Sequence, residues 1–209
     1  DALVDSDPGN PRHLAAAAQL YALYGSSFAG EPGRSALLTA RARDYGQRAL
    51  CAAERRACGI EDLDYDAYKA VLGRLGARDA EALYSYSVAS LAFIRAHSSD
   101  WTAIAGLPRV ESALQRLLEL PSAPNRAGIN MYLGILNTLR PEALGGRPEV
   151  GRRYFEEAIA LGGERDLAVK VEYARSYARL TYDRELHDRL LREVLATPVR
   201  EDGQTLFNV

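Results

Sequence analysis

The sequence has few of the residues that mark several common protein classes. Its 209 residues include only two Cys, one Met, one Trp and four Phe, and Lys and Arg gather in no single segment. Proteins that bind nucleic acid usually carry a basic stripe, so a net charge of −2 predicts no nucleic-acid partner. No apolar run approaches the ~18 residues of a membrane-spanning helix. A chain of this length can bury a core without help from a disulfide or a metal.

The two cysteines, Cys51 and Cys58, leave two alternatives open. On an unbroken helix their Cα atoms would lie roughly 10 Å apart, which is too far for a disulfide. If the helix ends between them, as Gly59 just beyond makes possible, they can pair. The alternatives are therefore a buried, reduced pair and a disulfide. No His lies near either Cys in the sequence, so a metal site is not expected there.

The hydrophobic periodicity predicts helices and no strands. Apolar residues recur at three- and four-residue spacing between regularly placed Gly and Pro, and no segment alternates with a period of two. Leu186, Leu190 and Val194, for example, form one helical stripe, while Arg189 and Glu193 face away. We expect helices at about 11–29, 34–57, 64–74, 79–97, 107–120, 126–139, 147–161, 167–181 and 183–196.

Similar short segments recur along the chain. Those beginning at Leu114, Phe155 and Leu191 share an apolar residue followed by an apolar pair three and four positions later, and the segment beginning at Tyr45 has its pair four and five positions later. Their spacing is one or two multiples of about 34 to 41 residues, which is the size of a helix pair. Tyrosines next to small residues mark the preceding helices, and Gly134 is expected to admit Phe155 and Ala158. The pattern predicts an all-α solenoid or ring of antiparallel helix pairs with degenerate tetratricopeptide-like (TPR-like) repeats, as one domain over residues 1–209.

Catalytic and metal-binding patterns were sought and not found. His13, His97 and His187 lie in different predicted helices, without metal-ligand spacing to another His, Cys or acid. Adjacent acids such as Glu156 and Glu157 point about 100° apart on a helix, so they cannot flank one substrate atom together. The sequence therefore predicts a non-enzymatic protein with no cofactor and no metal. For a helical enzyme, the only candidate groups are His97 and the acidic linker of Glu61, Asp62, Asp64 and Asp66.

The number of tyrosines is unusual, because the chain has twelve Tyr but only four Phe and one Trp. Tyr buries a large ring yet keeps a polar tip, which suits the wall of a wet groove, although any single Tyr more often fills a helix contact. Equivalent helices of a solenoid lie side by side, so tyrosines on the first helix of successive pairs should line one concave surface. Trp101 is expected to be an interhelix plug or, alternatively, a gate. The predicted ligand- or pore-lining residues are Tyr84, Tyr132, Tyr173, Tyr177, Asn130, Asn137 and Trp101.

An ordered set of motifs resembles one known family. It runs through Leu107-Pro108, Leu117 to Leu120, Gly128 to Gly134, Pro141-Glu-Ala-Leu-Gly-Gly-Arg-Pro148, Tyr154-Phe-Glu-Glu-Ala-Ile-Ala-Leu161, Val171-Glu-Tyr-Ala174 with Tyr177, and Asp183 to Leu195, ending in Leu206-Phe-Asn208. The first half agrees through fewer motifs, such as Ala82-Leu83-Tyr84. This order resembles the TatT component family, the accessory T subunit linked to tripartite ATP-independent periplasmic (TRAP) transporters.

The resemblance implies a helical, TPR-like protomer held in the periplasm, often as a lipoprotein, and assembled as a homotrimer. It also implies docking to a periplasmic solute-binding protein, with a pore or groove for a small apolar or carboxylate ligand. The chain departs from the family's pattern at Phe93, where many relatives have Trp, and after Asn208, where the family continues into a last helix. No lipid-bearing Cys is visible, so the lipid anchor is implied only by the resemblance.

The second functional hypothesis is a general TPR adaptor that binds a peptide or protein tail. Such grooves usually hold a carboxylate with basic or amide side chains that reach inward. Arg126, Asn130, Asn137 and Lys170 are the candidates for that role.

Overall fold

The computed structural model describes residues 2–163 and 166–198. Every regular element in these ranges is helical, which confirms the all-α class. The chain divides into two compact units, residues 1–124 and 125–209, and each is described by itself. The expectation of a single domain over 1–209 stays a prediction, as does the repeat relationship between helix pairs. Asn208, after which the family pattern continues into a last helix, lies outside the described residues.

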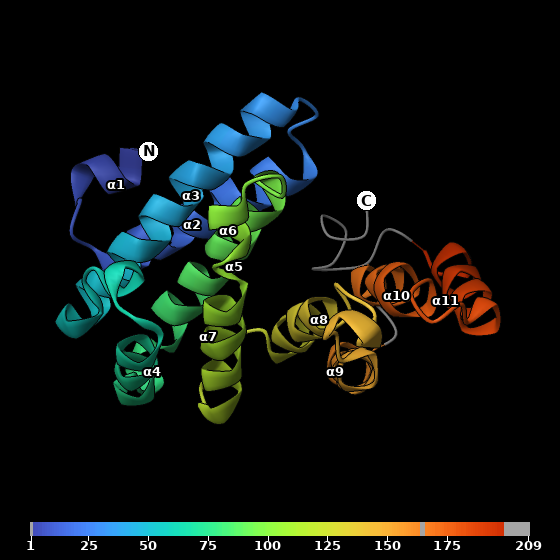
Figure 1. Ribbon diagram of the computed structural model, residues 1–209. Helices are drawn as coiled ribbons and strands as arrows, with labels where there is room; N and C mark the ends of the chain where they lie inside the picture. Colours follow the sequence, from blue (N-terminus) through green and yellow to red (C-terminus); the bar gives the residue numbers. More distant parts are fainter. Residues whose placement is uncertain (1, 164–165, 199–209) are drawn as a thin grey trace. The chain divides into compact units, whose positions relative to one another are not determined.

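The first unit contains α1 to α7 (Figure 1). Its elements are α1 (Ala2–Ser6), α2 (Pro11–Ser27), α3 (Pro32–Ala53), the 3-10 turns η1 (Arg55–Ala57) and η2 (Ile60–Asp62), α4 (Tyr65–Arg74), η3 (Ala77–Asp79), α5 (Ala80–Ala96), α6 (Trp101–Ile104) and α7 (Leu107–Glu119). Helices α2, α3 and α5 pack against one another, and α7 packs against α4 and α5. The sequence did not predict the short helices α1 and α6.

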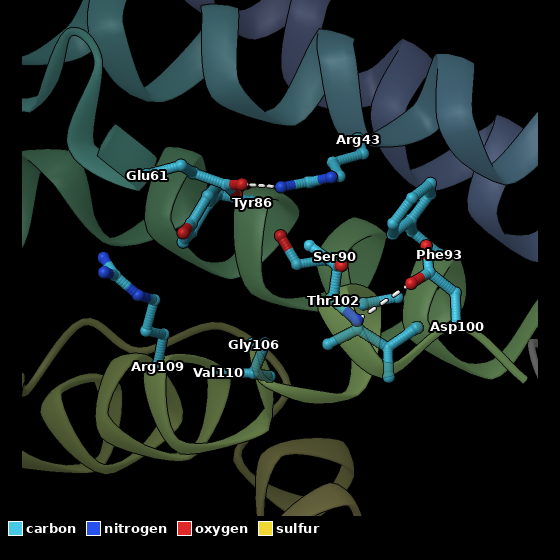
Figure 2. A pocket seen from close by; sticks show the side chains of 12 residues that line it. Arg43, Glu61, Tyr86, Ser90, Phe93, Asp100, Thr102, Gly106, Arg109 and Val110 are labelled. Carbon is cyan, nitrogen blue, oxygen red and sulfur yellow. Dashed lines mark hydrogen bonds and ion pairs between the residues drawn. The ribbon is translucent and has the colours of Figure 1, made fainter. Parts of the chain in front are cut away.

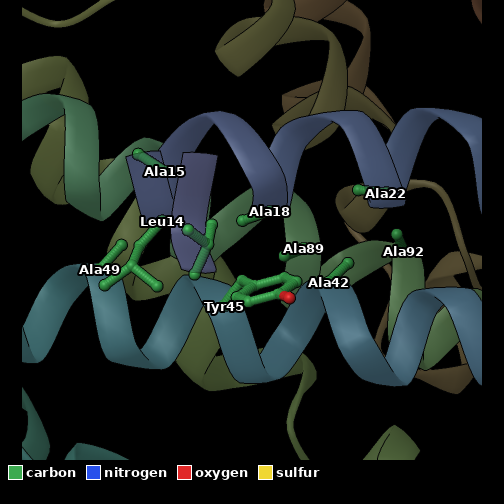
Figure 3. Close-up of a cluster of buried hydrophobic side chains, with 10 residues drawn as sticks. Leu14, Ala15, Ala18, Ala22, Ala42, Tyr45, Ala49, Ala89 and Ala92 are labelled. Atoms are coloured by element: carbon green, nitrogen blue, oxygen red, sulfur yellow. The ribbon is translucent and has the colours of Figure 1, made fainter. Parts of the chain in front are cut away.

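Small side chains bring the three long helices of the first unit close together. Figure 3 shows alanines from α2, α3 and α5 facing one another around the ring of Tyr45, which is 7% exposed. Gly46 continues this contact, because a Cβ there would lie 3.0 Å from the Cα of Tyr86. The alanine-rich composition thus becomes a close helix–helix interface. The buried members of this cluster are Val4, Leu14, Ala15, Ala18, Ala22, Ala42, Tyr45, Ala49, Ala89 and Ala92.

The cysteines form a disulfide, which settles the alternative left open by the sequence. Helix α3 ends at Ala53, earlier than the predicted end at 57, and the chain then turns so that the Cα atoms of Cys51 and Cys58 lie 4.4 Å apart. Gly59 follows with φ of 69°, a left-handed conformation that glycine adopts at little cost. The disulfide therefore joins the end of α3 to the segment that leads into η2.

The second unit contains α8 to α11. Its elements are α8 (Arg126–Asn137), the 3-10 turn η4 (Glu142–Leu144), α9 (Pro148–Gly162), α10 (Leu167–Tyr173), the π-helical segment η5 (Ala174–Ala178) and α11 (Arg184–Ala196). Helix α8 packs against α9, and α10 contacts α8, α9 and α11. The predicted helix at 167–181 is therefore an α-helix that continues as a π-helix, in which the Arg179 N–H donates to the Ala174 carbonyl five residues earlier.

The predicted contact between Gly134 and Phe155 is confirmed. A Cβ on Gly134 would lie 3.0 Å from three ring atoms of Phe155, and both Phe155 and Ala158 are fully buried. The Phe155 ring stacks in turn on Tyr173, with ring centroids 5.0 Å apart. The core of the second unit is thus built where the sequence indicated a small residue facing a large one.

Candidate functional site

A groove in the second unit lies among α9, α10 and α11. Its volume is about 540 Å³, and much of it is open to solvent. Apolar side chains of α9 and α11 and the ring of Tyr173 form part of its wall, and charged side chains form the rest. The lining residues are Arg152, Glu156, Ile159, Tyr173, Asp183, Glu185, Leu186, Arg189, Leu190 and Glu193.

Two tyrosines hold α10 and η5 against α9. The Tyr177 hydroxyl donates to Glu149 Oε1 at 2.7 Å, and the Tyr173 hydroxyl donates to Glu156 Oε1 at 3.4 Å. Glu149 and Glu156 are seven residues apart on α9, which is about two helical turns. The rings of Tyr173 and Tyr177 lie 5.5 Å apart, so the two hydroxyls contact α9 at successive positions on one face.

The tyrosine hydroxyls remain protonated hydrogen-bond donors. Burial raises the pKa of Tyr173 above its ordinary value, and the negative charge of Glu156 raises it further. Burial also raises the pKa of Tyr177, as does its hydrogen bond to Glu149. Arg152 donates to Glu156 at 2.8 Å, so the groove wall at this point consists of a neutral phenol beside an ion pair.

The α11 side of the groove is formed by residues with structural partners. Asp183 caps α11 by accepting the Leu186 N–H at 2.9 Å, and Glu193 pairs with the buried Lys170 at 2.9 Å. Leu186 and Leu190 are 8% and 4% exposed, so they present only small apolar areas to the groove. The groove can therefore accept a ligand whose apolar part lies on Leu186, Leu190 and Ile159. The polar end of such a ligand would lie at Arg152, Arg189 or Tyr173.

The structure brings together some of the residues predicted in the second unit. Tyr173 lines the groove, and Tyr177 lies beside it in the core with the partly buried Tyr132 packed against the same cluster. Asn130 and Asn137 are buried on α8, where each side-chain amide donates to a carbonyl four residues earlier. Their amide donors thus serve the backbone of α8.

Tyr84 and Trp101 belong to the first unit. Tyr84 is buried on α5 with 8% exposure. The expectation that Trp101 plugs a gap between helices is wrong, because its side chain is 82% exposed at the start of α6. Asp100 caps that short helix, which places Trp101 in its first turn, where the indole meets solvent.

Sequence reasoning missed most of the groove wall. Arg152 and Glu156 are spaced i,i+4 on α9, which on an exposed helix indicates only a surface ion pair. Leu186 and Leu190 were placed in an apolar stripe, but that pattern did not distinguish a core from a groove. To predict the groove from the sequence, one would need to know how α9 and α11 are aligned against each other. The apolar pattern within each helix does not contain that information.

Comparison with known proteins identifies the family. The family model described as TAtT, TRAP transporter T-component, matches residues 1–209, the whole chain. Comparison with curated proteins gives no match. No helix among the described residues has the length and apolar character required to cross a bilayer. Members of this family are components of a transporter, and the family is not a known family of enzymes. The chain belongs to the family of TRAP transporter T-components.

Proposed function

We propose that the chain is a non-enzymatic accessory component of a periplasmic TRAP-type uptake system. It docks a periplasmic solute-binding protein, assembles as a homotrimer and offers the groove of the second unit to a small apolar or carboxylate ligand. A lipid anchor outside the helical units holds it at a membrane. The groove beside Tyr173 is the observation that carries the ligand part of this proposal.

The groove chemistry supports a ligand with an apolar body and one polar end. Ile159, Leu186 and Leu190 offer the apolar contact, and the guanidinium groups of Arg152 and Arg189 offer donors. The Tyr173 hydroxyl donates to Glu156, so it offers a ligand only its oxygen as an acceptor. Acidic residues outnumber arginines in the lining, so a carboxylate requires Arg152 or Arg189 as its direct partner. The Cys51–Cys58 disulfide supports a periplasmic location for the chain, because structural disulfides persist in oxidising compartments.

Titration with octanoate and octanol tests the groove by calorimetry. Arg152→Gln should weaken octanoate binding by about tenfold and leave octanol binding nearly unchanged, because a charge-assisted hydrogen bond contributes about 1.5–3 kcal/mol. Arg153→Gln is the matched control, since Arg153 is exposed and donates to the backbone of its own helix. Equal loss in both variants, or no binding of either probe, would contradict the groove assignment.

Docking is tested separately by co-expression with the solute-binding protein encoded beside this chain. Native mass spectrometry should show a trimer that gains mass with that partner. A trimer that never gains mass would count against docking. Binding of short peptides with free carboxyl ends, in place of the partner, would favour the adaptor hypothesis. Of its candidate residues, Asn130 and Asn137 already donate to the α8 backbone and Lys170 already pairs with Glu193.

A further inference from the structure

A second hollow, within the first unit, shares no residue with the groove. It is a partly open cavity of about 130 Å³ lined by residues of α3, η2, α5, α6 and α7 and of the turn before α6. An engineered apolar cavity of about 150 Å³ admits benzene, so this space fits a guest of about five or six non-hydrogen atoms. The lining residues are Arg43, Glu61, Tyr86, Ser90, Phe93, Ile94, Asp100, Thr102, Ala103, Gly106, Arg109 and Val110.

The charged groups of this cavity already have partners in the fold. Figure 2 shows Arg43 of α3 paired with Glu61 of η2, and the Arg43 guanidinium also lies 4.6 Å from the Phe93 ring centroid. Asp100 accepts the Thr102 N–H at 2.8 Å. Arg109 donates to the carbonyls of η2 and the following residue, Ile60 and Leu63.

The charges of the lining also balance. Arg43 and Arg109 are matched in number by Glu61 and Asp100. A charged guest would bring an additional charge into a partly enclosed space, where desolvation is unfavourable unless a free partner of opposite sign compensates. The lining therefore favours a guest without net charge.

Ser90 is the one buried side chain of this lining whose hydrogen bonding is incomplete. It is 4% exposed, and its Oγ has no hydrogen-bond partner among the described residues. The neighbouring serines of α5 differ, because Ser85 and Ser87 donate to the carbonyls of Glu81 and Leu83 at 2.9 and 2.7 Å. Figure 2 shows Ser90 between the Arg43–Glu61 pair and the side of the cavity formed by Gly106 and Val110.

A buried hydroxyl without a partner is costly, and in folded proteins such a group usually meets a ligand or an ordered water. A hydroxyl both donates and accepts, so it is satisfied by a neutral carbonyl, amide or alcohol. The apolar part of the wall consists of Phe93, Ile94, Ala103 and Val110. The cavity thus offers one polar anchor and one hydrocarbon surface.

We propose that this cavity binds a neutral organic molecule of about five or six non-hydrogen atoms, such as a short-chain primary amide or alcohol. Its polar group hydrogen-bonds to Ser90 Oγ, and its short hydrocarbon chain packs on Phe93 and Val110. This site is additional to the groove of the proposed function and does not depend on it.

Butyramide and butyrate provide a matched pair of probes, because they have similar shape and differ in charge. On the full chain, saturation-transfer NMR and chemical-shift titration should show butyramide binding at least tenfold tighter than butyrate. Ser90→Ala should weaken butyramide binding by about three- to tenfold, which corresponds to one hydrogen bond. Ala103→Leu, which fills the cavity, should abolish it.

Ser87→Ala is the control for Ser90→Ala. Ser87 is fully buried on the same helix, but its hydroxyl is already bonded within α5 and it does not line the cavity. This variant should bind butyramide as the unmodified chain does. Equal binding of both probes, equal effects of both serine variants, or a cavity that holds only water at saturating butyramide would overturn the proposal.

Discussion

Gly134 shows how a single missing side chain permits a helix contact. Three atoms of the Phe155 ring lie only 3.0 Å from where a Cβ would be, and Phe155 is itself fully buried against Tyr173. An added methyl group cannot be accommodated without moving a packed aromatic ring. The contact therefore depends on the hydrogen at this position.

Gly134→Ala should lower the free energy of unfolding by about 1–3 kcal/mol, as is typical of an overpacked core. Urea denaturation followed by circular dichroism measures this change. Gly73→Ala is the matched control, since Gly73 is an exposed helical glycine of α4 with no atom near its Cβ position. That variant should gain up to about 1 kcal/mol from helix propensity. A similar effect of both substitutions would contradict the packing argument.

Tyr68 makes the first unit sensitive to alkaline pH. It is fully buried, donates to the Arg109 carbonyl at 2.9 Å and is hydrogen-bonded to Tyr86. Burial raises its pKa to about 12, compared with 10.0 in a model compound, and Tyr86 shifts in the same direction. The folded state therefore holds the proton more tightly than the unfolded chain does.

The stability due to Tyr68 should be complete below pH 10 and should be lost as the pH rises from about 10 to about 12. The loss is about 2–3 kcal/mol, because each pKa unit corresponds to about 1.4 kcal/mol. Thermal melts between pH 9 and 12 measure it. Tyr68→Phe should be less stable at neutral pH but should lose less on alkalinisation, and equal slopes for both proteins would refute the assignment.

At the scale of residues, burial could be predicted more easily than partners. Any single tyrosine is expected to fill a helix contact more often than to face a ligand, and Tyr45, Tyr68 and Tyr86 are indeed buried. Tyr84 and Tyr177, which are predicted to line a ligand surface, are buried as well. Their acceptors could not be predicted, since the bond from Tyr177 to Glu149 joins residues 28 apart in the sequence. Such a bond depends on the register of two helices, which local periodicity does not encode.

At the scale of elements, most helices begin and end near their predicted positions, because Pro, Gly and capping side chains mark their ends. Asn10 caps α2 and Asp64 caps α4, each in front of an apolar pattern. The prediction was wrong at the end of α3, where the helix stops at Ala53 although its pattern continues. A disulfide and a left-handed Gly59 fix that turn, and neither follows from hydrophobic spacing.

The Cys51–Cys58 disulfide should stabilise the first unit by about 2–3 kcal/mol through the short loop that it closes. Replacing both cysteines with serine should lower the urea midpoint accordingly. Addition of dithiothreitol should lower the midpoint of the unmodified chain by a similar amount and leave the double variant unchanged. An unchanged midpoint in the double variant would mean that the turn is held by its other contacts alone.

At the scale of the whole molecule, the disulfide and the family both bear on where the chain works. TRAP transporter T-components fit a periplasmic or membrane-associated role, and the described part of the chain offers no helix able to span a bilayer. A cytosolic location would expose the cysteines to reducing thiol pools. The oxidation state of the native protein thus reports where it folded.

Protein is taken from its native cells, and its free thiols are labelled at once with a maleimide-coupled polymer. It should gain no mass on a denaturing gel, because both cysteines are held in the disulfide. After reduction, both Cys51 and Cys58 should be labelled, which gives a two-step shift. Labelling of both cysteines without reduction would place the chain in a reducing compartment and contradict the periplasmic assignment.

The π-helical turn at Ala174–Ala178 has a consequence for how this chain tolerates changes in length. Such a turn closes on the carbonyl five residues earlier instead of four, so it holds about one residue more than an α-helical turn does. Deleting one residue there should restore an α-helical turn and leave the chain on either side nearly in place. A turn at residues 179–182 separates this segment from α11, so Leu186 and Leu190 should keep their places in the core. The segment is therefore a position where the chain can lose one residue at less cost than within a regular helix such as α9.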